Sequence, residues 1–212
     1  SWIDHHLVNV LAFNVDALRL SAYFSKPRGG PLEFGPVWDF DRALNSTDGR
    51  DANPRIWKSN QGDGGTDFFN YTWWGRLFED PDFWQRYVDR YQQLRENQFS
   101  TSSIFALIDE LAGQVRPMQP REAARWPGFT TPRGSYEAEV VALKNWLTRR
   151  LNFMDTNFLA MPRFSLPSGT IAAGAQLTLS GPPGSTLYYT TDGTDPRAPG
   201  GAIAPSARAY SG

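Results

Sequence analysis

The spacing of the apolar residues changes at Met161-Pro162, and this change constrains the fold more than any other feature. Upstream, apolar residues recur at helical spacing. From Phe164 onward they alternate between Gly-Pro-Pro-Gly and Asp-Gly turns, a pattern typical of short strands. We therefore predict an α+β chain with a mostly helical part over 1–161 and an immunoglobulin-like β-sandwich over 162–212. About 50 residues are few for a seven-stranded sandwich, so we expect this second part to be truncated.

Helices are predicted in four stretches of the first part. Ser1 and Asp4 resemble a capping box at the start of the first helix, whose apolar spacing is interrupted near Asp16. Asp80-Pro81 is typical of a helix start. The later predicted helices cover residues 81–94, 102–112 and 136–158, with several prolines between the last two.

A hairpin and a long loop separate the first helix from the others. Strand-like runs at 22–25 and 32–37 flank a Pro- and Gly-rich turn, which predicts a β-hairpin. Residues 45–67 are polar and rich in Gly, Asn and Asp. Long loops in compact domains are often functional, so this stretch is a candidate region.

Composition excludes several classes of function. The chain has 21 basic and 22 acidic residues, so a broad nucleic-acid-binding surface is not expected. It has no apolar run long enough to span a bilayer. It has no cysteine, which excludes disulfides, thiolate nucleophiles and cysteine-based zinc sites.

Three aspartates are the strongest candidates for chemistry. Asp16 follows the first helix, and Asp39 and Asp41 follow the hairpin within Trp38-Asp39-Phe40-Asp41. Carboxylates after a helix and after a nearby hairpin can converge on one point. Such a group suits a hard cation such as Mg²⁺, and one carboxylate can accept a hydroxyl proton. Asp-x-Asp pairs also occur in ordinary surface turns, so spacing alone leaves both interpretations open.

The order of these residues resembles the spore coat protein H (CotH) kinase family. The resemblance rests on Asn14-Val15-Asp16, then Tyr23-Phe24 and the hairpin, then Trp38-Asp39-Phe40-Asp41. It continues through the helical residues, over roughly 1–160 in all. It implies a kinase-like C-lobe with the hairpin at the active site. It also implies an atypical, exported protein kinase that transfers phosphate from ATP to Ser or Thr of surface or coat proteins, with Mg²⁺ or Mn²⁺.

The resemblance also implies roles for individual residues. The catalytic-loop aspartate of the family corresponds to Asp16, and its metal-binding aspartate to Asp39. Phosphoryl transfer needs both an acceptor-orienting carboxylate and a bound metal. Asp41 is a further metal contact or a structural acceptor. The metal-binding Asn of kinases, five residues after the base, is replaced here by Ser21, which places the second metal site and activity in question.

The residues that would clamp ATP are not found in this sequence. No glycine-rich phosphate loop and no Lys–Glu pair precede Asp16, and the glycines at 62–65 follow the metal motif. We therefore expect the nucleotide-binding N-lobe to lie upstream, in a longer protein. A fragment without that lobe is expected to be inactive alone.

Other candidate residues have simpler interpretations. His5 and His6 are adjacent on a helix and point about 100° apart, so we expect one to face solvent and one to pack near the site. The aromatic residues of 68–74 could form a sugar- or peptide-binding platform, but the core interpretation is favoured. Arg149 and Arg150 are expected to be solvated.

The C-terminal part resembles the chitobiase/β-hexosaminidase C-terminal domain. The resemblance rests on residues 187–197, a strand that runs into an Asp-Gly turn and then Asp195-Pro196. It implies an accessory module for spacing or for attachment, with cell-envelope polysaccharide as the partner, on an exported bacterial protein. Two alternatives to a kinase stay open: an inactive kinase-like cell-surface scaffold, and a carbohydrate-active enzyme that uses paired carboxylates.

Overall fold

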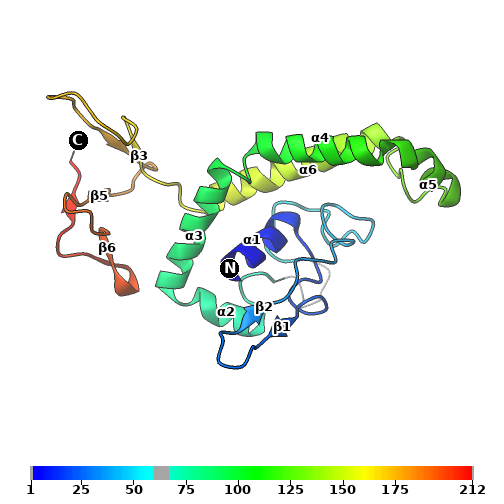
Figure 1. Cartoon of the computed structure of the whole chain (residues 1–212), viewed down its shortest axis with the longest axis horizontal. Helices are drawn as coiled ribbons and strands as arrows, with labels where there is room; N and C mark the ends of the chain where they lie inside the picture. The colour runs from blue at the N-terminus through cyan, green and yellow to red at the C-terminus, as the bar shows by residue number, and fades with distance from the viewer. Residues whose placement is uncertain (1, 60–66, 212) are drawn as a thin grey trace.

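Three regions make up the molecule in Figure 1: a helical body, a long arm and a C-terminal segment of short strands. The computed structural model describes residues 2–59 and 67–211. Ser1 of the predicted capping box and the glycines at 62–65 lie outside the described residues. The combination of long helices with short strand pairs agrees with the predicted α+β class.

The helices of the body are α1, α2 and α3, and the arm is formed by α4 and α6 with α5 at its far end (Figure 1). Their bounds are α1 Trp2–Ala12, α2 Thr72–Phe78, α3 Pro81–Glu96, α4 Thr101–Val115, α5 Gln119–Arg125 and α6 Tyr136–Asn157, with short 3₁₀ helices at η2 Arg116–Met118 and η3 Pro199–Gly201. The strands are β1 Phe24–Ser25, β2 Glu33–Phe34, β3 Arg163–Phe164, β4 Leu179–Ser180, β5 Tyr188–Tyr189, β6 Arg197–Ala198, β7 Ala202–Ile203 and β8 Arg208–Ala209.

Side-chain caps fix where the long helices begin. The Asp80 carboxylate accepts from the backbone N–H of Asp82 at 2.8 Å, one residue before α3. Ser100 and Ser135 cap α4 and α6 in the same way. Each cap satisfies backbone N–H groups that have no partner within the helix. Removal of a capping side chain typically lowers stability by about 1 kcal/mol. The predicted starts of α3 and α6 are therefore confirmed, and the helix predicted over 102–112 is longer than expected.

The core packs α1 against α3 and α6. Almost every residue in the second half of α1 is buried, and it meets Tyr87 and Tyr91 of α3 and Trp146 and Leu151 of α6. The aromatic residues of 68–74 contribute as the core interpretation predicted, because Phe68 and Trp74 are fully buried. Trp73 is the exception, with 41% of its surface exposed.

The expectation that Arg150 is solvated is wrong. Arg150 is fully buried, and its guanidinium donates to the backbone oxygens of Val10, Pro54 and Ile56 at 2.6 to 3.0 Å. The rings of Phe13 and Trp57 lie 4.9 and 5.1 Å from its Cζ atom. Burial lowers the pKa of Arg150 to about 9, so the side chain still carries its charge at neutral pH. The apolar periodicity of the sequence could not predict the burial of Arg150, because its carbonyl partners come from segments that are distant in the sequence.

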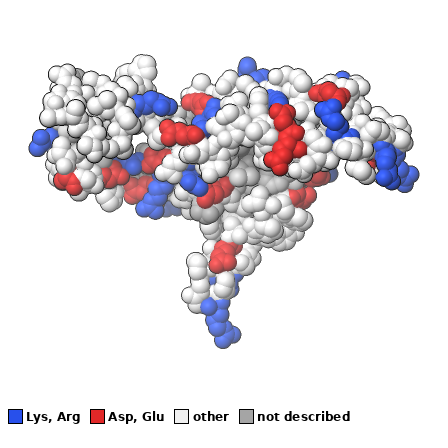
Figure 2. Space-filling view, turned by 45° about the horizontal axis from the view of Figure 1, so that its top comes forward, with Lys and Arg blue, Asp and Glu red and all other residues white. Residues whose placement is uncertain are grey.

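The hairpin near the candidate site is shorter than predicted. Strands β1 and β2 pair antiparallel, with Phe24 opposite Phe34 and Ser25 opposite Glu33. The loop between them is exposed, and Figure 2 shows it as a narrow projection from the body. Gly35 follows β2, and its N–H donates to the Tyr23 oxygen at 2.6 Å.

The C-terminal strands pair as separate two-stranded ladders. Among the described residues the pairs are β3–β4, β5–β8 and β6–β7, all antiparallel. A packed immunoglobulin-like sandwich therefore stays a prediction. This segment contacts α3: Arg197 bonds to Asp89 at 2.8 Å, and the Gly200 N–H donates to Asp82 at 2.9 Å. Within the described part of the chain, no helix combines the length and apolarity needed to cross a membrane.

Candidate functional site

Asn14 organises the turn that carries Asp16. The chain leaves α1 through Phe13, which has a left-handed φ of 50°. Asn14 is buried, and its amide nitrogen donates to the Asn9 side chain and to the Asp39 backbone oxygen, both at 3.1 Å. Its amide oxygen accepts from the Asp16 N–H at 3.3 Å. The Asn14 side chain thus connects the segment of Asp16 to that of Asp39, which lies 25 residues after Asn14.

Backbone contacts hold the same two segments together. The Leu44 N–H donates to the Ala12 oxygen at 2.9 Å, and the Val15 N–H to the Arg42 oxygen at 3.5 Å. Asp39 has a φ of 63°, a left-handed conformation that Asp tolerates better than most residues. The turn after the hairpin is therefore folded back onto the end of α1.

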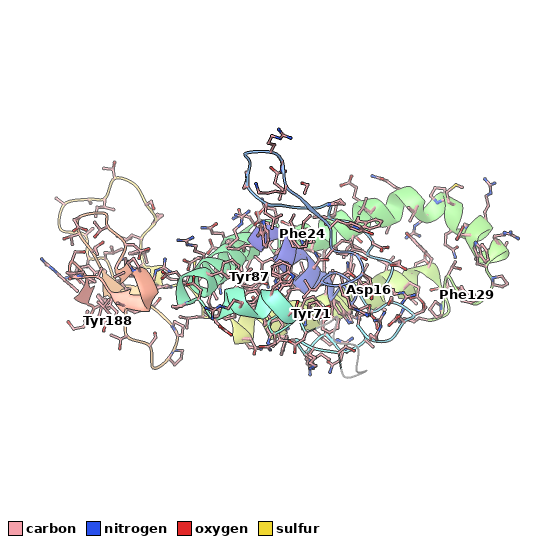
Figure 3. All side chains as sticks on the ribbon, turned by 90° about the horizontal axis from the view of Figure 1, so that it is seen from below. Asp16, Phe24, Tyr71, Tyr87, Phe129 and Tyr188 are labelled. Atoms are coloured by element: carbon pink, nitrogen blue, oxygen red, sulfur yellow. The ribbon has the colours of Figure 1, made fainter. Side chains whose placement is uncertain are left out.

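The four predicted site residues line one open pocket of about 270 Å³. Figure 3 shows Asp16 beside the helical body, well separated from Tyr188 in the C-terminal segment and from Phe129 at the end of the arm. The side chains differ in exposure, since Asp16 and Ser21 are buried and Asp39 and Asp41 are exposed. The full lining is Asp16, Leu20, Ser21, Tyr23, Trp38, Asp39, Asp41 and Arg42.

Ser21 and Asp39 are directly bonded. The Ser21 hydroxyl donates to Asp39 Oδ2 at 2.9 Å. The indole N–H of Trp38 donates to the Ser21 backbone oxygen at 3.1 Å, and its ring packs 5.7 Å from that of Tyr23. The hydroxyl thus orients one carboxylate oxygen of Asp39, which leaves the other oxygen for a further contact.

Two arginines flank Asp16, and the sequence pattern did not point to either. Arg50 lies 3.5 Å and Arg42 lies 3.9 Å from the Asp16 carboxylate. Asp48 bonds to Arg50 and lies 3.4 Å from Arg42. The hydrogen bond from Arg50 lowers the pKa of Asp48, and the same bond raises the pKa of Arg50. The sequence signals were weak: Arg50 lies in the long polar loop, and Arg42 directly follows Asp41 of the candidate motif.

Both histidines are buried, so the expectation that one faces solvent is wrong. The His5 ring packs against Phe34 with centroids 3.8 Å apart. His6 Nε2 is 2.9 Å from the Phe68 oxygen and Nδ1 is 2.8 Å from the Tyr87 hydroxyl. A carbonyl can only accept, so Nε2 donates and Nδ1 accepts from Tyr87. Burial lowers the pKa of His6 to about 3, so this ring is a neutral core group and does not line the pocket.

The pocket offers oxygen donors of the kind that Mg²⁺ and Mn²⁺ prefer. Within residues 2–59 and 67–211, no group of three or more His, Cys, Asp or Glu side chains is arranged to hold a metal ion. The pocket is lined by two exposed carboxylates, those of Asp39 and Asp41, and by Ser21. Mg²⁺ is commonly held in this way, by one or two carboxylates together with substrate phosphates and water.

Comparison with known proteins places most of the chain in one family. The family model described as CotH kinase protein matches residues 1–154. The model of the chitobiase/β-hexosaminidase C-terminal domain matches residues 166–202. No curated protein and no solved structure matches the chain. Because the first match covers well over half of its length, this chain belongs to the CotH kinase protein family.

Proposed function

We propose that the protein is an exported kinase that transfers the γ-phosphoryl group of ATP to Ser or Thr of a surface or coat protein. The observation that carries the proposal is the shared pocket of Asp16 and Asp39, whose segments are tied together by Asn14. Membership of the CotH kinase protein family supports it. The chitobiase-type module supports an extracytoplasmic location and attachment to envelope polysaccharide.

In this proposal Asp16 orients the acceptor. Its carboxylate accepts the hydrogen bond of the attacking hydroxyl and takes its proton as the new phosphorus–oxygen bond forms and the bond to ADP breaks. Arg42 and Arg50 hold the carboxylate in place through contacts of 3.9 and 3.5 Å. Arg42 also lines the pocket, so its positive charge favours the negative charge on the transferred phosphoryl group.

Asp39 has the second role, because its carboxylate is positioned by Ser21. Asp39, with Asp41 and Ser21, would hold Mg²⁺ or Mn²⁺. That ion, when bound, neutralises charge on the phosphate oxygens. Ser21 stands where protein kinases have Asn, and its hydroxyl is already used to donate to Asp39.

An inactive scaffold is the second candidate function. It is favoured by Ser21, which stands where protein kinases have a metal-binding Asn and whose hydroxyl donates to Asp39. In that case the pocket would have no catalytic activity, and the C-terminal module would attach the protein to the cell envelope.

Label transfer from ATP decides between the two. The full-length protein is incubated with labelled ATP, Mg²⁺ or Mn²⁺ and an array of Ser- and Thr-containing peptides. We expect transfer that is lost in Asp16→Asn and Asp39→Asn and kept in Asp192→Asn, a matched change in an exposed turn of the C-terminal segment. Absence of both transfer and calorimetric ATP binding in the unsubstituted protein would overturn the kinase proposal and support the scaffold.

A further inference from the structure

A larger pocket lies in the body and shares no lining residue with the acidic pocket, which is the one lined by Asp16, Ser21, Asp39 and Asp41. It has a volume of about 720 Å³, within the range of small-molecule sites. Its walls come from α2, the first turn of α3, the end of α6, Trp57 of the long loop and residues 69–70. Trp57, Phe69, Phe78 and Trp84 contribute aromatic rings, and Asn70 and Asn157 contribute amide groups.

The aromatic walls are rigid. Phe69 packs edge-to-face against Trp57 at 5.1 Å and against Phe78 at 4.8 Å, and its centroid lies 5.7 Å from Trp84. Phe78 and Trp84 meet at 6.0 Å. Each of these rings belongs to the core packing but keeps part of its surface exposed. A ligand therefore meets fixed aromatic surfaces, which require little ordering on binding.

The polar groups of the pocket present hydrogen-bonding atoms. Asn157 Nδ2 donates to the Phe153 oxygen at 2.7 Å, and Asn70 Nδ2 donates to Asp67 at 3.2 Å. These bonds use the nitrogen of each amide, and each side chain also carries a carbonyl oxygen that can accept from a ligand. Thr72 adds a hydroxyl, which can donate or accept.

The charges of the pocket cancel. Arg76 of α2 and Glu79, the residue that follows α2, form an ion pair. A phosphate-bearing ligand is bound best by an unpaired cation, and Arg76 of this pocket is paired. A ligand without polar groups would make no hydrogen bond to the Asn70 and Asn157 amides. A neutral ligand with hydroxyl groups and an apolar C–H face satisfies all of these surfaces.

We propose that this pocket binds a neutral saccharide. The sugar lies with its C–H face on the rings of Trp57 and Trp84, and its hydroxyl groups bond to Asn70 and Asn157. The proposal does not depend on the kinase assignment, because it uses no residue of the acidic pocket. The site would give the protein a contact with polysaccharide that is separate from the C-terminal module.

The test uses the full-length protein and neutral tetrasaccharides of β-linked glucose, N-acetylglucosamine and xylose and of α-linked glucose. Binding is followed by tryptophan fluorescence and by calorimetry. We expect saturable binding to at least one probe, with a dissociation constant that rises at least about ten-fold in Asn157→Ala, a loss of about 1.4 kcal/mol. Asn152→Ala is the matched control, since Asn152 is exposed on α6 and does not line the pocket.

A second variant guards against misfolding. Trp84→Phe keeps an aromatic ring and a hydrophobic core but reduces the stacking surface, so we expect weaker binding with an unchanged helical circular dichroism spectrum. Absence of saturable binding to all four probes would overturn the proposal. Binding that survives both Asn157→Ala and Trp84→Phe would also overturn it and would assign the saccharide contact to another part of the protein, such as the C-terminal module.

Discussion

A single buried histidine shows how much a residue's chemistry depends on its surroundings. His6 was a candidate for catalysis only because the chain has two histidines. In the fold both of its nitrogens are used, one toward Phe68 and one toward Tyr87. This arrangement requires the neutral ring, and burial lowers its pKa to about 3.

His6 therefore predicts a pH dependence of stability. The unfolded chain binds a proton near pH 6.5 while the folded chain does so near pH 3, so the unfolded state binds more protons between these values. The stabilisation is complete above pH 6.5 and is lost as the pH falls. We expect the free energy of unfolding to drop by about 2 kcal/mol from this group between pH 7.5 and 5.0.

Chemical denaturation at several pH values checks this. His6→Gln keeps an amide donor for Phe68 and an acceptor for Tyr87 but does not titrate, so its curve should be flatter by that amount. His5→Gln is the comparison, because burial lowers the pKa of His5 as well but to a smaller extent. If His6→Gln has the same slope of unfolding free energy against pH as the unsubstituted protein, His6 is not the group responsible.

The β1–β2 hairpin is the element that shapes the acidic pocket. It carries Tyr23 before the first strand and leads into Trp38 after the second, and both rings line the pocket. Gly35 makes the turn possible, because a Cβ atom at this position would lie 2.6 Å from the Tyr23 oxygen. Any other residue must push these two segments apart.

Gly35→Ala should therefore reduce activity more than stability. Displacement of a catalytic segment by about 1 Å can cost about a hundred-fold in rate. The hairpin projects from the body, so the melting temperature should change little (Figure 2). Transfer rate and thermal melting are measured together, with Gly113→Ala as the control because a Cβ there meets open space. A Gly35→Ala protein with normal transfer would show that the hairpin does not position the site.

At the scale of the whole molecule, Arg150 joins segments that are distant in the sequence. From α6 it bonds to Val10 of α1 and to Pro54 and Ile56 of the long loop. Trp146, one turn earlier, donates to the Asp51 oxygen at 3.0 Å. These two side chains fix the loop that carries Arg50 beside Asp16. The arm, the first helix and the candidate site are thus one connected structure.

Arg150→Met should destabilise the protein by about 2–4 kcal/mol. The substitution removes a buried charge but leaves backbone oxygens without donors, and each such loss costs about 1–3 kcal/mol. Arg149→Met, at the adjacent exposed position, should change stability by less than about 0.5 kcal/mol. Denaturation midpoints of the two variants are compared. Equal midpoints would mean that the buried guanidinium contributes nothing net.

The sequence by itself predicted the four longest helices and indicated the family, but it did not predict the short helices α2 and α5. Local signals suffice for helix starts, because a cap such as Asp80 acts on N–H groups two and three residues away. The motif that contains Asp16 and Asp39 could also be recognised from the sequence, because it consists of residue types in a fixed order along the chain. The roles of these aspartates, with Asp41 and Ser21, stay predictions.

Only the tertiary structure decided which groups surround each candidate. Arg50 meets Asp16 across 34 residues, and Arg150 meets Val10 across 140. The pocket of Trp57 and Trp84 likewise joins residues that no local pattern connects. The physical reason is that helix propensity and capping act over a few residues, while burial, ion pairing and cavity shape depend on how distant segments pack.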